Sequence, residues 1–184
     1  VEMFIKKAIK KELKIFENIK KIQNQIMFIN LGVFSKAPKS KLQNEKNAIC
    51  NLKKLALLTI GIAISKYKKE LSQEHELLMR ISDIIIETYI AESSLLKTEK
   101  MIAKYGIESN KIQIEMTKNY INNALNISNT CAKEVILAST KNLKQSLLMR
   151  TINKLSKQSN YDMKDIRRNI ANALIKDKKY NFSI

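Results

Sequence analysis

The 184-residue sequence has no tryptophan, one histidine, one proline and three glycines. So few turn-forming residues disfavour a β-sandwich or a β-barrel and favour long helices. A lone histidine cannot by itself supply a histidine-based metal site, and the sequence has no glycine-rich phosphate loop. The longest apolar run, residues 55–64, spans about ten residues, which is too short to cross a bilayer. The two cysteines, Cys50 and Cys131, both fall on apolar helix faces, which favours buried thiols in a reducing compartment.

Positive charge is what the sequence has in excess, with a formal net charge of +17. A field of this sign attracts nucleic acid, anionic lipid and other acidic partners. Only four of the 34 basic residues are arginine, however, and sites that grip phosphates or base edges favour the planar arginine fork. We therefore interpret the charge as largely compositional and do not expect a nucleic-acid partner. A free-standing basic helical module that binds nucleic acid or anionic lipid is the alternative.

Residues 77–103 form the most regular helical pattern in the sequence. The first apolar row is Leu77, Ile81, Ile84, Thr88, Ala91, Leu95 and Ile102. The second row is Leu78, Ile85, Tyr89 and Leu96. Steps of three and four place both rows on one broad face of a helix, and a face this wide must be covered from more than one side. We predict a central helix that ends at Gly106 and is capped at its start by Ser72.

Three further segments have helical spacing, residues 45–71, 109–138 and 142–156, and Asp162 is placed to cap a last helix. In the second of these segments the expected apolar line is Ile112, Met116, Tyr120, Ala124, Ile127, Cys131, Val135 and Ala138. In the last helix the expected buried line is Ile166, Ile170, Ala173 and Leu174. No segment alternates in the manner of a strand.

We therefore predict an all-α fold, an antiparallel helical bundle of five or six helices preceded by a basic amphipathic helix. Gly32 and Pro38 mark the clearest break in the pattern. The expected organisation is an amphipathic linker helix over residues 1–34, an exposed loop over residues 35–47 and a bundle domain over residues 48–184. Because Val1 already lies inside a helical pattern, we expect the chain to be part of a longer polypeptide.

The amphipathic segment near the start of the chain is the main candidate for a binding surface. Its apolar line includes Ile5, Ile9, Leu13, Phe16 and Ile19, and its lysines, among them Lys6, Lys10 and Lys14, lie largely off that line. Such a helix fits the surface of an anionic membrane. It also fits a helix docked on the rest of a larger protein, which we favour because amphipathicity is the normal state of a surface helix. The sequence leaves both interpretations open.

No catalytic or metal-binding constellation stands out. Glu92 and Glu99 are seven residues apart on the central helix and could be acid–base groups or di-iron ligands. A di-iron bundle needs Glu-x-x-His motifs, which one histidine cannot supply. We therefore expect these glutamates to be exposed surface charges or to form ion pairs with Arg80, Lys97 and Arg150. Such pairs stabilise a protein little when they are exposed. We predict no catalytic, cofactor-binding or metal-binding residue in this chain.

Particular runs of residues carry a family resemblance. They are NLKKLALLTIG (51–61) with SKY (65–67), EHELLM (74–79) with DIIIETY (83–89) and AESSLLKTEK (91–100), and DIRRNIANALI (165–175) with KYNF (179–182). Together they resemble the C-terminal helical extension of bacterial acyl-CoA dehydrogenases related to the very-long-chain enzyme. The run MFIKKAIKKEL (3–13) resembles the segment that joins the catalytic core to that extension.

The resemblance implies a parent enzyme that uses FAD to remove two hydrogens from the Cα and Cβ atoms of an acyl-CoA thioester in fatty acid β-oxidation. Its flavin site, its acyl-CoA site and its catalytic glutamate, in an E-G-T-N-type motif, belong to domains that precede such an extension, and this sequence has no such motif. The implied function is a non-catalytic domain that packs on the catalytic core of a homodimer and contacts a membrane surface through the linker. The implied location is cytoplasmic or peripheral to a membrane. The lysine-rich loop 36–46 departs from the family pattern, and its role stays open.

Overall fold

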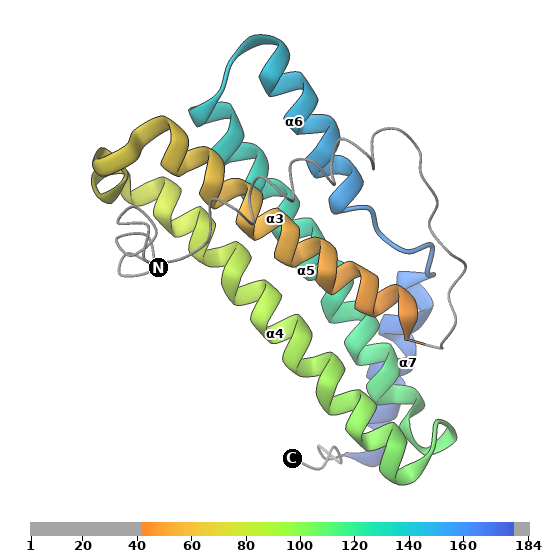
Figure 1. Cartoon of the computed structure of the whole chain (residues 1–184). Coiled ribbons are helices and arrows are strands. Elements are labelled where there is room, and N and C mark those ends of the chain that lie inside the picture. The colour runs from red at the N-terminus through yellow and green to blue at the C-terminus, as the bar shows by residue number, and fades with distance from the viewer. Residues whose placement is uncertain (1–41, 179–184) are drawn as a thin grey trace.

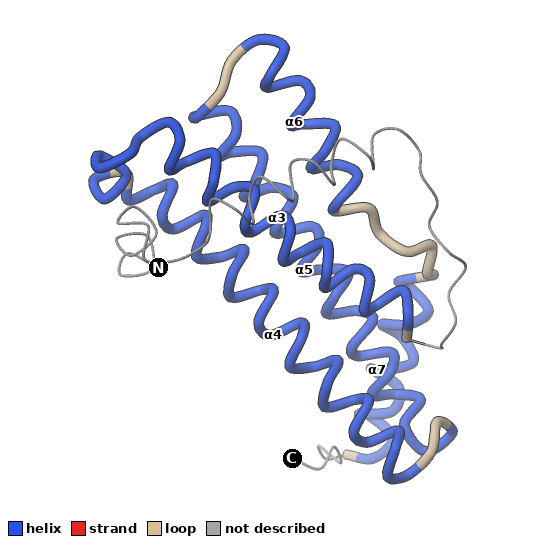
Figure 2. Tube along the Cα trace, viewed as in Figure 1, coloured by secondary structure: helices blue, strands red, loops and turns tan. Residues whose placement is uncertain are grey.

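The computed structural model describes residues 42–178, which form five α-helices and two short 3-10 helices and contain no strand. Figures 1 and 2 show the helices α3 (Gln43–Tyr67), α4 (His75–Tyr105), α5 (Lys111–Ser139), α6 (Asn142–Leu155) and α7 (Met163–Asp177). The 3-10 helices η1 (Lys68–Gln73) and η2 (Glu108–Asn110) connect the first three helices. The all-α prediction is confirmed. The amphipathic helix expected over residues 1–34 lies outside the described residues.

Three long helices, α3, α4 and α5, lie side by side along the molecule, and α4 runs antiparallel to the other two (Figure 1). Each of the three contacts the other two. The shorter α6 packs beside α3 and α5 at one end of the bundle, and α7 packs on α5 at the other end (Figures 1 and 2). Short connections place sequential helices next to one another, as expected for an up-and-down bundle.

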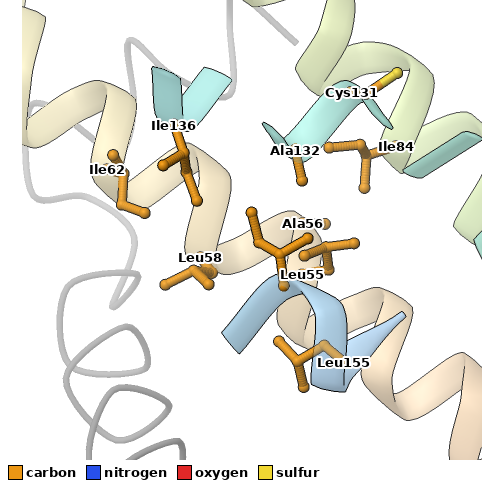
Figure 3. Packing of buried hydrophobic residues seen from close by; sticks show 10 residues of the cluster. Leu55, Ala56, Leu58, Ile62, Ile84, Cys131, Ala132, Ile136 and Leu155 are labelled. Atoms are coloured by element: carbon orange, nitrogen blue, oxygen red, sulfur yellow. The ribbon is translucent and has the colours of Figure 1, made fainter. Parts of the chain in front are cut away.

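Buried aliphatic side chains from four helices form the core. Figure 3 shows its largest cluster, in which Leu55 and Leu58 of α3 lie near Leu155 of α6 and Ile136 of α5. Ile84 of α4 belongs to the same cluster and is fully buried. Each such side chain contributes about 1.5–3 kcal/mol on burial. The core thus consists mainly of isoleucine, leucine and alanine.

The two ends of α4 test the capping predictions. Gly106 follows the helix with φ +80°, a left-handed conformation that favours glycine, so the predicted end of the helix is confirmed. The Asn110 side chain donates to the backbone oxygens of Met101 at 3.1 Å and Gly106 at 2.7 Å, which satisfies carbonyls near this end. The prediction for the other end is wrong, because Ser72 lies within η1 and its Oγ donates to the Lys69 carbonyl.

The last helix begins as predicted but is less buried than expected. Asp162 accepts hydrogen bonds from the backbone N–H groups of Lys164 at 3.0 Å and Asp165 at 3.2 Å. None of the residues of α7 is buried, and Leu174 is exposed on 37% of its surface. The predicted buried line is therefore only partly covered, because α7 packs mainly on α5.

The start of α3 corrects the expected boundary at residue 47. The helix begins at Gln43, and both Leu42 and Glu45 are buried. Leu42 packs in a cluster with Ala91 and Leu95 of α4, so the bundle extends at least five residues further toward the N-terminus than expected. Residues 35–41 of the expected loop lie outside the described residues.

The buried face of α5 is rotated from the expected apolar line. Ile127 is 43% exposed and Ala138 is exposed, whereas Thr117 and Ser128 are buried. Thr117 is tolerated in the interior because its hydroxyl pairs with that of Thr98 on α4 at 2.7 Å.

Candidate docking surface and polar sites

The interface between α4 and α5 contains polar pairs without the arrangement of a catalytic site. The Tyr120 hydroxyl donates to Glu87 Oε2 at 2.9 Å across the two helices. Burial, and then the hydrogen bond to Glu87, raise the pKa of Tyr120 to about 12. A phenol with so high a pKa keeps its proton at neutral pH, so the pair links the helices and is a poor acid–base catalyst there.

A second polar cluster joins the start of α3 to the connection between α6 and α7. Glu45 is only 2% exposed, and its Oε1 accepts a hydrogen bond of 2.7 Å from the Tyr161 hydroxyl. Its Oε2 is buried without a hydrogen-bond partner, next to a cavity of about 10 Å³. Burial, and then the bond to Glu45, raise the pKa of Tyr161 above its usual value. The ammonium of Lys118 lies 4.7 Å from the centre of the Tyr161 ring. This cavity holds about one water molecule and is too small for a substrate.

The carboxylates of the central helix are ion-pair partners. Glu92 pairs with Lys53 at 2.5 Å and Glu99 pairs with Lys46 at 2.6 Å, so their partners are lysines of α3. Arg80 pairs with Glu134 of α5 at 2.5 Å. Residues 42–178 contain no group of three or more side chains suited to hold a metal ion.

The two cysteines differ from each other in burial. Cys50 is exposed, contrary to expectation, and Cys131 is buried as expected. Burial, and then the carboxylate of Asp83, raise the pKa of the Cys131 thiol. A raised pKa disfavours the thiolate, which is the reactive form of cysteine.

An apolar groove lies between α3 and α4 among the described residues. It has a volume of about 490 Å³. Its lining comprises Lys53, Ala56, Leu57 and Ile60 of α3 and Ile85, Thr88, Tyr89 and Glu92 of α4. Tyr89 is 71% exposed. The groove therefore follows the middle of the second apolar row of the central helix, at Ile85 and Tyr89. In that row Tyr89 and Leu96 are exposed, whereas Leu78 and Ile85 are partly buried against the core.

The surface of α4 beside this groove is also apolar. Met79, Ile86 and Ile90 are all large hydrophobic residues exposed by between 38% and 57%. Their steps of seven and four residues place them on one side of the helix, which we call the outer face of α4. Apolar surface that continues over several turns of a helix is typical of a protein–protein contact.

The predicted docking or membrane face belongs to the N-terminal segment. Ile5, Lys6, Ile9, Lys10, Leu13, Lys14, Phe16 and Ile19 all lie outside the described residues. Among the described residues, one helical stretch, Gln43–Gln73, is long and apolar enough to cross a membrane. The longest uninterrupted apolar run within it, residues 55–64, is too short to do so. Because 67% of the most apolar window of Gln43–Gln73 is buried in the bundle, this stretch has the character of a core helix.

Fold and surface together define an all-α bundle with exposed apolar residues along α4. A family model described as "Acyl-CoA dehydrogenase, C-terminal domain" matches residues 51–154, more than half of the chain. The chain therefore belongs to the family of acyl-CoA dehydrogenase C-terminal domains.

Two relatives show the extent of the match. The chain is 30% identical over 178 residues to a protein called "Probable acyl-CoA dehydrogenase" from Bacillus subtilis (strain 168). The aligned region covers 96% of this chain and 29% of that protein. The chain superposes with a TM-score of 0.89 and 29% identity on an acyl-CoA dehydrogenase complexed with FAD from Bacillus anthracis. That match covers 98% of this chain and 30% of the solved one. The chain thus spans about 30% of the length of either relative.

Proposed function

We propose that this chain is the non-catalytic C-terminal domain of an FAD-dependent acyl-CoA dehydrogenase of fatty acid β-oxidation. The observation that supports this most strongly is the structural match, which covers almost all of this chain but less than a third of an FAD-bound enzyme. On this proposal the remainder of the parent enzyme supplies the flavin site, the acyl-CoA site and the catalytic base. The bundle supplies packing surface.

The outer face of α4 is the surface that we assign to the catalytic core. If the core covers Met79, Ile86 and Ile90, their burial would stabilise the contact by about 25 cal/mol for every Å² of apolar area removed from water. We also propose that the domain stabilises a homodimer by reinforcing the contacts between two catalytic cores. This part rests on the family resemblance, as does a cytoplasmic location.

Membrane contact through residues 1–34 stays a prediction. The apolar line of that segment can face either lipid or protein, and the α3–α4 groove offers it protein.

Co-elution tests the proposed function. The catalytic portion of the parent enzyme and this chain are produced as two polypeptides, mixed and separated by size-exclusion chromatography. We expect the flavin absorbance of the catalytic portion to elute earlier when this chain is present. Separate elution of the two wild-type polypeptides would overturn the proposal.

Two sets of variants locate the contact. The triple variant Met79→Lys, Ile86→Lys, Ile90→Lys is expected to abolish co-elution. Leu174→Lys with Ile175→Lys is the matched control, because these residues of α7 are likewise exposed and apolar, by 37% and 71%. If the triple variant still co-elutes, the domain contacts the core through another face.

The alternative, a free-standing basic module, predicts a different result. Duplex DNA should then shift in a gel at low salt and the shift should weaken steeply as salt rises. Membership in the acyl-CoA dehydrogenase family weighs against that alternative.

A further inference from the structure

We propose that the groove between α3 and α4 is the binding site for the apolar face of residues 5–26 of the same chain. The groove lies where α4 faces α3. Arg80 and Glu87 of α4 pair with residues of α5, whereas Glu92 of α4 pairs with Lys53 of α3. Ile85 and Tyr89 line the groove together with Glu92, and they form the wall that α4 contributes.

The floor of the groove fits an aliphatic helix. Ala56 is small and Leu57, Ile60 and Ile85 are aliphatic, so the ridge of another helix can settle between α3 and α4. The one charged pair at the rim, Lys53 with Glu92 at 2.5 Å, is already neutralised internally. An apolar groove with a neutral rim selects the apolar side of an amphipathic helix and leaves its charged side in water.

Residues 5–26 present that kind of side. Their apolar line is Ile5, Ile9, Leu13, Phe16, Ile19, Ile22 and Ile26, at steps of three and four. Residues 1–21 contain seven lysines and three glutamates, and this charge lies largely off the apolar line. Docking in the groove would therefore bury the aliphatic row and keep the lysines hydrated.

The covalent connection makes the contact reachable. Leu42, the first described residue, packs beside Ala91 and Leu95, near one end of the groove wall. The fifteen residues from 27 to 41 can extend about 50 Å, whereas the row from Leu78 to Leu96 is about 27 Å long. As a helix, residues 5–26 would span about 33 Å, enough to cover that row. Binding within one chain also benefits from an effective concentration in the millimolar range.

Hydrogen exchange on the complete chain tests the proposal. Amides of residues 9–26 are expected to exchange slowly in the wild type. In the variant Leu57→Lys, Tyr89→Lys they should exchange about tenfold faster or more, while the core amides of α5 keep their protection. Tyr89→Lys alone is a second variant that should act in the same direction, and its 71% exposure makes it safe for folding. The matched control is Ile86→Lys, which lies on the outer face of α4, is 53% exposed and should leave residues 9–26 protected.

Vesicles distinguish the groove from a membrane as the destination of the same apolar face. The double variant Leu57→Lys, Tyr89→Lys should bind vesicles of phosphatidylserine and phosphatidylcholine about tenfold more tightly than the wild type. The reason is that the apolar face of residues 5–26 is released from the groove. Equal binding of the two proteins would overturn the proposal, as would unprotected amides in residues 9–26 of the wild type. Protection that is unchanged in both groove variants would also overturn it. None of these outcomes depends on the catalytic core, so they are separate from the co-elution test.

Discussion

Removing the hydroxyl of Tyr161 should destabilise the bundle by about 2 kcal/mol. This hydroxyl donates to Glu45 Oε1 at 2.7 Å, and Glu45 is 2% exposed with no hydrogen-bond partner for its other oxygen. A hydrogen bond to a charged group contributes about 1.5–3 kcal/mol, and an unsatisfied buried carboxylate costs a similar amount. In the variant Tyr161→Phe the Glu45 carboxylate loses that hydrogen bond but remains buried.

Urea unfolding followed by circular dichroism measures the effect. For a chain of this size, about 2 kcal/mol corresponds to a fall of about 4–8 °C in Tm. Tyr105→Phe is the control, because Tyr105 is 50% exposed and its change should stay within about 0.5 kcal/mol. In a Glu45→Leu background, Tyr161→Phe should cost much less, because no buried carboxylate remains to be left unpaired.

The double-mutant cycle gives a clear refutation. If Tyr161→Phe costs the same with and without Glu45, the two side chains are not coupled and the hydrogen bond is not what stabilises this end of the bundle. A cost no larger than that of Tyr105→Phe would have the same meaning.

Three other predictions concern the core, a helix cap and pH. Ile84→Ala should cost about 2–5 kcal/mol in urea unfolding because Ile84 is fully buried, whereas Ile86→Ala on the surface should cost under about 1 kcal/mol. Asp162→Ala should cost about 1 kcal/mol through the lost cap of α7, and an unchanged urea midpoint would contradict the assigned cap. Because the pKa of Tyr120 is raised to about 12, its stabilising contribution is present below about pH 10 and is lost as the pH rises toward 12. Between pH 9 and 11 the Tm should therefore fall less steeply with pH for Tyr120→Phe than for the wild type. Equal slopes of Tm against pH for the two proteins would contradict this.

Helical periodicity located the elements well and their surroundings less well. The central helix, expected over residues 77–103, is observed as His75–Tyr105, because its apolar rows and Gly106 are local features of the sequence. Its second row was expected to be covered, yet Tyr89 and Leu96 are 71% and 58% exposed. A periodic pattern shows that a face is apolar, but not whether the same domain or a neighbour covers it.

Polar contacts between distant residues were beyond the sequence. Glu45 and Tyr161 are separated by 116 positions, and nothing local marks Glu45 as buried. On α5 the interior accepts Thr117 because Thr98 lies opposite, a pairing that depends on the register of two helices. The lysine partners of Glu92 and Glu99 were missed for the same reason, because they lie on α3.

A titration of FAD with the purified chain tests the central claim most directly, because the claim is that this domain packs and performs no flavin chemistry of its own. Flavin fluorescence should stay unchanged as the chain is added to molar excess, both with and without an acyl-CoA thioester. Saturable quenching at one flavin per chain would contradict the account.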